Sequence, residues 1–449
     1  MSVIDHFARD HLPDAADLPD MIFTLPALQY PARLNCVARL LDDWVARGHG
    51  AAPCLIGTAE RLNYAEAQAR VNRIANILVD QFGIAPGMRV LLRAPNSPML
   101  AACMLAVIKA GAIAVPTMPM LRARELVYPM EKSEIALAIC DIRLRDDMVG
   151  ARAMVPGPVL YFGTDEFATL LAGASDAFTA VDTAIDDVCL IGFTSGTTGQ
   201  PKGAMHFHRD LLAACDAYSA NVLRPTASDR FIGSPPLGFT FGMGGMLLFA
   251  LHCGASTVLL ERAGPDDLLT AIPQYQATIC VSAPTAYRAM LGKLAGNDFS
   301  TLRKCVSAGE TLPKATFDAW LAASGLRLLD GIGSTEMFHI FIASPEDQAR
   351  GGATGQVVPG YEARVVDPAG NQLPDGTSGR LAVRGPTGCK YLSDPRQKTY
   401  VQNGWNLTGD TYIRDAEGYF WFQARSDDMI VSAGYNIAGP EVEAVQIGI

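Results

Sequence analysis

Short apolar runs alternate with amphipathic segments over residues 35–140. The run 89–93 is typical of a buried strand, whereas after Asn63 apolar residues recur every three or four positions, as on one helical face. Asn63 is also a favourable N-cap for that helix. The pattern predicts helices over 35–47, from 63, from 99 and over 125–132, with strands at 53–57, 89–93, 112–116 and 135–140. Such alternation favours a mostly parallel sheet covered on both faces.

The same rhythm starts again at residue 188, although the two halves share no sequence repeat. It predicts strands at 188–193, 230–233, 256–260, 277–282, 304–307 and 327–330, with helices over 210–221, from 242 and over 266–275. From about residue 351 glycine and proline become frequent, and a period of two replaces helical spacing, as in 362–366 and 380–384. We therefore expect antiparallel strands there, arranged as a small barrel.

Two apolar stretches, 99–121 and 242–260, are long enough to suggest membrane spans. Each breaks in the middle, at Gly111 with Pro116 in the first and at Gly254 in the second. A buried helix, a tight turn and a buried strand therefore fit both stretches better than a span.

Composition narrows the class of protein. The chain has 449 residues, of which 49% are hydrophobic and 18% charged, so it can bury a large core. A formal net charge of −10 argues against a general nucleic-acid binder. Ten cysteines are scattered without a Cys-x-x-Cys pair, so neither a zinc site nor a disulfide framework is expected. This cysteine usage favours the reducing environment of the cytoplasm. Early charges and no apolar run at the N-terminus give no sign of a signal peptide.

The segment 194–203 follows an apolar strand and combines glycines, hydroxyl side chains and one lysine. Glycines permit close backbone approach to a ligand, and successive N–H groups with a lysine form a site for anions. A polyphosphate is the expected ligand, although the spacing is not that of the nucleotide-binding loop Gly-x-x-x-x-Gly-Lys-Ser/Thr. The alternative is a flexible polar loop.

Three more polar clusters follow predicted strands, at 307–310, 330–336 and 405–410. Ligands of α/β sheets bind outside the carboxyl ends of strands, so this placement is informative. Alone, the clusters 307–310 and 405–410 would more often be turns, and Glu336 would more often be an exposed acid. Together with the loop they indicate a nucleotide site, with Glu336 as a carboxylate and Asp410 as an acceptor for ribose hydroxyls.

These motifs resemble those of the adenylate-forming superfamily of acyl- and aryl-CoA ligases, luciferases and peptide-synthetase adenylation domains. The loop TSGTTGQPKG is the most specific, and GIGSTEM, WNLTGD and ARSDDMI support it. Within the superfamily, SPPLGFTFGMGG and DGIGSTEMFHIF are similar to benzoate- and 2-aminobenzoate-CoA ligases. The resemblance runs from about residue 35 to the C-terminus. It implies an α/β fold of two mostly parallel sheets covered by helices, plus a small β-barrel-like subdomain.

The resemblance also implies domain boundaries and residue roles. The boundaries are an arm at 1–34, an adenylation domain at 35–426 (35–187, 188–350 and 351–426) and a hinge with the start of a further domain at 427–449. The ATP phosphates would be held by Thr194, Ser195, Gly196, Thr197, Thr198, Gly199 and Lys202. Thr194, Lys202 and Glu336 would be catalytic, with Glu336 binding Mg²⁺. The rest of ATP or AMP would contact Ser307, Ala308, Gly309, Glu310, Asp330, Gly331, Ile332, Gly333, Ser334, Thr335, Asp410 and Arg425. Asp427 would be the hinge.

The chain departs from the superfamily pattern in two places. Ile332 stands where many relatives stack an aromatic ring on adenine, so an apolar contact replaces stacking. Relatives also continue into a mobile C-terminal domain with a catalytic lysine, whereas this chain stops at Ile449. On that basis the expectation is weak adenylation and little thioester formation by these 449 residues alone.

The acyl pocket is expected to be lined by Phe239, Thr240, Phe241, Ala308, Gly331, His339 and Ile340. Aromatic and small residues suit a flat ring better than an alkyl chain, and Phe239 would gate the path of the thiol. His339, expected at the start of a helix, is either structural or a hydrogen-bond partner for an ortho amino or hydroxyl group. His206 and His208 are interpreted as structural rather than metal-binding.

The predicted reaction converts an aromatic acid and MgATP to an acyl-adenylate and then, with CoA, to a thioester. Two alternatives stay open: a medium-chain acyl-CoA ligase, and a non-catalytic module that binds ATP and an acid. A homodimer is possible, although no exposed apolar stripe argues for one.

Overall fold

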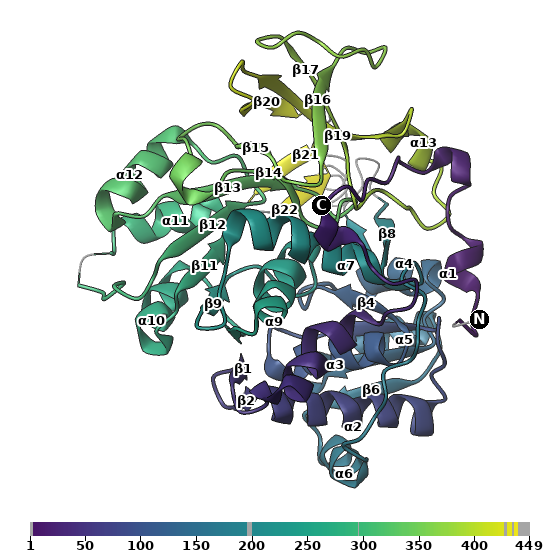
Figure 1. Ribbon diagram of the computed structural model, residues 1–449. Coiled ribbons are helices and arrows are strands. Elements are labelled where there is room, and N and C mark those ends of the chain that lie inside the picture. The colour runs from purple at the N-terminus through teal and green to yellow at the C-terminus, as the bar shows by residue number, and fades with distance from the viewer. Residues whose placement is uncertain (1–2, 195–199, 295, 426–428, 433–434, 439–449) are drawn as a thin grey trace, which may run out of the picture.

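The computed structural model describes residues 3–194, 200–294, 296–425, 429–432 and 435–438 (Figure 1). Its first sheet has six strands in the order β6-β5-β3-β4-β7-β8, parallel except for the antiparallel pair β7–β8. The strands are β3 (Arg89–Arg93), β4 (Ile113–Thr117), β5 (Leu137–Asp141), β6 (Val159–Phe162), β7 (Val188–Thr194) and β8 (Lys202–Phe207). Its helices are α2 (Tyr64–Phe82), α3 (Pro98–Lys109), α4 (Ala123–Lys132), α5 (Arg145–Met154) and α6 (Asp165–Gly173).

Local sequence signals set the helix ends in this half. The Asn63 side chain accepts a hydrogen bond from the Glu66 amide, and the Glu66 carboxylate accepts one from the Asn63 amide, so α2 begins with the capping box that Asn63 predicted. Gly83, with φ of 63°, ends it. Ser97 caps α3, which is buried on nearly every side and turns into β4, as expected for 99–121. Among the described residues, no helix is both long and apolar enough to cross a membrane.

The second sheet has nine strands in the order β15-β14-β13-β12-β11-β9-β10-β1-β2. The neighbouring strands β13, β12, β11, β9, β10 and β1 are parallel to one another. The edge strands β2 on one side and β14 and β15 on the other pair antiparallel. Its strands are β1 (Pro53–Ile56), β2 (Arg61–Asn63), β9 (Arg230–Gly233), β10 (Ser256–Val258), β11 (Ile279–Ser282), β12 (Lys304–Ala308), β13 (Leu328–Gly333), β14 (Ile340–Ala343) and β15 (Gln356–Val357). The two sheets with their helices confirm the predicted α/β class.

Helices cover this sheet, and several contain π-helical turns. They are α7 (His208–Ala214), η6 (Cys215–Leu223), α8 (Thr240–Gly242), η7 (Met243–Leu248), α9 (Phe249–Cys253), α10 (Pro265–Tyr275), α11 (Pro284–Leu291) and α12 (Lys314–Ser324). The predicted helix at 35–47 includes the π-helical segment η3 (Ala38–Asp42) and ends within a second one, η4 (Val45–His49). Shorter helical segments are α1 (Phe7–Asp10), η1 (Ala15–Asp17), η2 (Pro26–Leu28), η5 (Ile142–Leu144), η8 (Glu346–Gln348) and α13 (Gln397–Tyr400).

The two large sheets exchange strands. β1, from early in the chain, pairs with β10 in the nine-stranded sheet and carries β2 at the edge, whereas β7 and β8 join the six-stranded sheet. Hydrogen bonding therefore crosses the expected boundary at 187/188 in both directions. The domain division stays a prediction, and the sheets themselves are built from both halves.

A third, antiparallel sheet lies above the other two in Figure 1. Its strands are β16 (Glu362–Val366), β17 (Ser378–Arg384), β18 (Val401–Gln402), β19 (Trp405–Arg414) and β20 (Phe420–Arg425), with the order β16-β17-β19-β18 and β20 on β19. The antiparallel strands were predicted; within the described residues they form an open sheet rather than a closed barrel, because no pairing leads back to β16. A separate hairpin joins β21 (Met429–Ser432) and β22 (Tyr435–Ala438).

Candidate functional site

A cavity of about 660 Å³ opens at the carboxyl ends of β12 and β13. Most of the residues predicted for the site line it: Thr194, Phe239, Thr240, Phe241, Ala308, Gly309, Glu310, Asp330, Gly331, Ile332, Gly333, Ser334, Thr335, His339, Ile340, Asp410 and Arg425. Ser307, Lys202 and Glu336 lie outside the lining. Ser195, Gly196, Thr197, Thr198, Gly199 and Asp427 fall outside the described residues.

The hairpin of β7 and β8 positions Lys202. Its register pairs Thr194 with Lys202, so the two ends of the segment 194–202 lie side by side. The Lys202 Nζ is 3.4 Å from Oε1 of Glu336, which is 6% exposed. The loop lysine and the predicted metal ligand are therefore neighbours, although 134 positions separate them (336 − 202).

Two tyrosines that sequence reasoning missed complete this cluster. The Tyr391 hydroxyl donates a hydrogen bond to Oε1 of Glu336. The Lys202 Nζ lies 5.1 Å from the Tyr391 ring centroid and 5.9 Å from that of Tyr400, within cation–π range. Neither tyrosine belongs to a motif, so only its position in space reveals it.

Glu336 is held as a carboxylate. Burial alone would raise its pKa, but the charge of Lys202 and the hydrogen bond from Tyr391 outweigh burial and hold the pKa below its usual value. Carboxylate oxygen is the donor type that Mg²⁺ prefers. A buried anionic oxygen beside a lysine thus fits a metal that accompanies phosphates.

Asp410 and Arg425 face each other across the third sheet. The register of β19 and β20 pairs them, and Nη1 of Arg425 lies 3.4 Å from Oδ1 of Asp410. The expectation that the cluster 405–410 follows a strand was wrong, because these residues are inside β19. Tyr412 lies two positions further on the same face and lines the cavity, as does Phe422 of β20, with ring centroids 5.5 Å apart. Side chains two positions apart on a strand share a face, so the position of Asp410 could have identified Tyr412 from the sequence.

His339 lies in an aromatic environment. The expectation that His339 starts a helix was wrong. It lies in a turn just before β14, because Phe338 has φ of 69°. Its ring centroid is 4.5 Å from that of Phe249 and 5.6 Å from that of Tyr218. Burial lowers the pKa of His339 to about 3, so its imidazole is neutral at ordinary pH.

The hydrogen bonding of His339 sets its tautomer. Its Nε2 lies 3.3 Å from the carbonyl oxygen of Phe241, which only accepts, so Nε2 carries the proton and donates. Nδ1 is then an acceptor, and it is buried with no hydrogen-bond partner among the described residues. The Tyr218 hydroxyl is in the same situation. Buried polar atoms of this kind are normally satisfied, so both are candidates for contact with a ligand.

Glu310 is anchored to the start of α11. The Thr285 amide donates to Oε2 of Glu310 at 3.2 Å, and the Thr285 hydroxyl donates to the same oxygen. Arg288 of the same helix also lines the cavity. Sequence reasoning missed both, although they follow the carboxyl end of β11 and the strand-end rule applies there too. Other lining residues that it missed are Phe193, Thr311, Phe338 and Thr354.

Asp330 should make stability depend on pH. Burial raises its pKa to about 8, although the Ser307 hydroxyl and the Gly331 amide favour the charged form. The unfolded chain loses this proton near pH 3.9, whereas the folded protein keeps it to about pH 8. In between, the folded state binds more protons, so this group lowers stability progressively as pH rises through that window.

Replacing Asp330 by asparagine should remove that dependence. The Tm of Asp330→Asn relative to wild type should rise by a few °C between about pH 4 and pH 8. Thermal unfolding across this range measures it, with the exposed Asp347→Asn as control. A Tm difference that is constant, or shrinks as pH rises, would contradict the assignment.

Comparison with known proteins identifies the family. A family model described as AMP-binding enzyme matches residues 42–391. Benzoate–CoA ligase of Thauera aromatica is 32% identical over 435 residues, covering 94% of this chain and 82% of that protein. Anthranilate–CoA ligase of Pseudomonas aeruginosa is 34% identical over 375 residues, covering 80% and 71% respectively.

A solved structure agrees with these matches. The crystal structure of an anthranilate CoA ligase in complex with anthranoyl-AMP is similar with a TM-score of 0.86 and 31% identity, covering 94% of this chain and 84% of that one. With a family match over most of its length, relatives above 30% identity and a shared fold, the chain belongs to the AMP-binding enzyme family of adenylate-forming acid–CoA ligases.

Proposed function

We propose that the protein activates an aromatic carboxylic acid of the benzoate or 2-aminobenzoate type as an acyl-adenylate, and that CoA then forms the thioester. One observation carries this proposal. A single cavity is lined both by Thr194, where the loop begins, with the pair Asp410 and Arg425, and by the aromatic segment 239–241. A nucleotide and a flat acid would therefore meet inside it.

The residues divide the work by their chemistry. Lys202 and the loop from Thr194 would hold the phosphates, and Glu336 would hold Mg²⁺, which neutralises phosphate charge when it is bound. Asp410 would accept hydrogen bonds from the ribose, and Ile332 would pack against adenine. An oxygen of the aryl carboxylate attacks the α-phosphorus, the bond to the bridging oxygen breaks, and pyrophosphate leaves with the electron pair.

The residues expected to contact the acid support the choice of acid. Phe239, Phe241 and Ile340 line the cavity, are apolar and match an aromatic ring. The Nδ1 of His339 is a buried acceptor that an ortho amino or hydroxyl group could satisfy. Because a neutral imidazole cannot neutralise a carboxylate, His339 would recognise the ring substituent rather than the acid group.

Exchange of radiolabelled pyrophosphate into ATP tests the first half-reaction. We expect exchange that depends on benzoate or 2-aminobenzoate and none with octanoate. Exchange with octanoate alone would favour a medium-chain acyl-CoA ligase. If ATP raises the Tm but no acid supports exchange, the chain is a binding module instead.

The remaining expectations from sequence are also proposals. A role in the degradation of aromatic compounds, a cytoplasmic location and a homodimer rest on the sequence and the family alone.

A further inference from the structure

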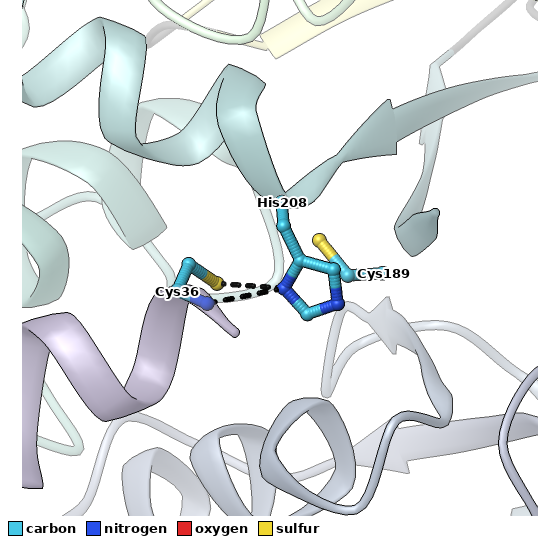
Figure 2. A group of neighbouring side chains, drawn as sticks. All are labelled: Cys36, Cys189 and His208. Atoms are coloured by element: carbon cyan, nitrogen blue, oxygen red, sulfur yellow. Dashed lines mark hydrogen bonds between the residues drawn. The ribbon is translucent and has the colours of Figure 1, made fainter. Parts of the chain in front are cut away.

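Three metal-ligating side chains meet in the core, away from the cavity. Cys36 lies just before η3, Cys189 is in β7, and His208 is the first residue of α7. The two thiols are 0% exposed and the imidazole is 1% exposed. Their three candidate ligand atoms all lie within 4.8 Å of one another, and Figure 2 shows both thiols beside the imidazole ring.

Cys36 and His208 are already in direct contact. The Cys36 Sγ is 3.2 Å from Nδ1 of His208, and the Cys36 amide donates to the same nitrogen at 3.3 Å. Because the amide donates to it, Nδ1 is the unprotonated nitrogen, which is the form that a metal ligand needs, and an ion there would take the place of the amide hydrogen bond. An ion bound to both at about 2.3 Å from sulfur and 2.1 Å from nitrogen would separate them by roughly 3.6 Å. For this pair, a shift of a few tenths of an ångström would give that spacing.

A buried thiol on its own would indicate nothing more than packing. Nine of the ten cysteines are buried, and thiols such as Cys140 and Cys215 simply donate to backbone carbonyls. The three residues above are the one group of three or more ligating side chains found in the described part of the chain. They come from three separate segments of the chain, so they meet only because the chain folds, not because they are close in sequence.

The donor set selects the kind of ion. Two sulfurs and an imidazole nitrogen suit soft, thiophilic cations rather than Mg²⁺ or Ca²⁺, which prefer oxygen. Two thiolates would make a Zn²⁺ complex neutral, and neutrality lowers the cost of burial. Cu⁺ would leave one negative charge, but it accepts three ligands, whereas structural Zn²⁺ normally takes four.

We propose that Cys36, Cys189 and His208 bind one soft metal cation, Zn²⁺ or Cu⁺, that joins the helical segment after the N-terminal arm to β7. Cys189 lies five residues before Thr194 in the strand that leads to the phosphate loop. The ion would hold that strand and the start of α7 in place. Sequence spacing could not suggest the site, because its first two ligands are 153 positions apart (189 − 36) and no Cys-x-x-Cys pair occurs.

Metal analysis of the full chain tests the proposal. Because the site is closed, the protein is expressed in medium supplemented with Zn²⁺ or with copper, purified under reducing conditions and assayed by mass spectrometry. We expect one equivalent of one ion in the wild type, with sulfur scatterers in its X-ray absorption spectrum. The preferred ion distinguishes Zn²⁺ from Cu⁺. Removal by a strong chelator should lower the Tm.

Matched variants locate the ion. Cys36→Ala and Cys189→Ala should each lose the bound metal, whereas Cys54→Ala, which changes an equally buried thiol that is not part of this group, should keep it. If the first two variants fail to fold, the metal content of the wild-type protein still tests the proposal. Metal-free protein from both media, or metal retained in both folded variants, overturns the proposal. So does a Cys36–Cys189 disulfide in protein isolated without oxidant.

Discussion

Replacing Glu336 by glutamine should lower acid-dependent pyrophosphate exchange by about 10²–10³-fold, the size of effect that follows the loss of one group that stabilises a transition state electrostatically. Glutamine has the same shape and can still accept the hydrogen bond from Tyr391. It lacks the charge that faces Lys202 at 3.4 Å and that would bind Mg²⁺. The exchange rate at saturating acid and ATP, measured over a range of Mg²⁺ concentrations, gives the effect.

Glu346→Gln is the matched control, since it changes an exposed acid in η8. It should exchange at the wild-type rate. An exchange rate for Glu336→Gln within about twofold of wild type would remove this residue from the proposed metal site. A thermal unfolding curve close to that of wild type shows that the variant is folded.

Replacing Gly244 by alanine should lower kcat/KM for the aromatic acid by about tenfold or more, because overpacking of this kind costs about 1–3 kcal/mol. A Cβ at Gly244 would lie 2.4 Å from Cδ2 and 3.0 Å from Nε2 of His339. Phe249, with its ring centroid 4.5 Å from that of His339, limits retreat on one side. The imidazole would have to move toward the cavity that it lines.

ATP binding should not change in Gly244→Ala, because the residues proposed to contact the nucleotide, such as Thr194, Asp410 and Arg425, lie in β7, β19 and β20, not in η7. Steady-state kinetics with the acid and titration with ATP separate the two effects. Gly292→Ala is the control: a Cβ there has no atom within 4 Å, so its kinetics should match wild type. Equal losses in acid and ATP binding would mean general unfolding rather than a displaced His339.

The sequence predicted the buried strands best. The ranges 89–93, 230–233 and 362–366 match β3, β9 and β16 residue for residue. Each is a short apolar or alternating run bounded by polar residues or glycine, and such runs determine their own limits. The π-helical turns of η6 and η7 were not predicted, since hydrophobic spacing barely distinguishes a π-turn from an α-turn.

The candidate site was predictable where motifs follow strands and not elsewhere. Gly309 and Gly333 line the cavity because parallel strands end at the same edge. Tyr391 contacts Glu336 from a part of the chain with no recognisable motif. His339 was expected on a helix, because its apolar neighbours fit either period, and only the positive φ of Phe338 turns the chain into β14.

The exchange of strands between the two large sheets affects how the chain folds while it is being synthesised. Leu55 of β1 pairs with Thr257 of β10, about 200 residues later. At a synthesis rate of roughly 5–20 residues per second, β1 waits about 10–40 s for its partner. During that time an apolar strand edge is open to wrong pairing in the nascent chain. Chaperones that shield the first 60 or so residues should therefore raise the yield of folded protein more than those that act on the finished chain.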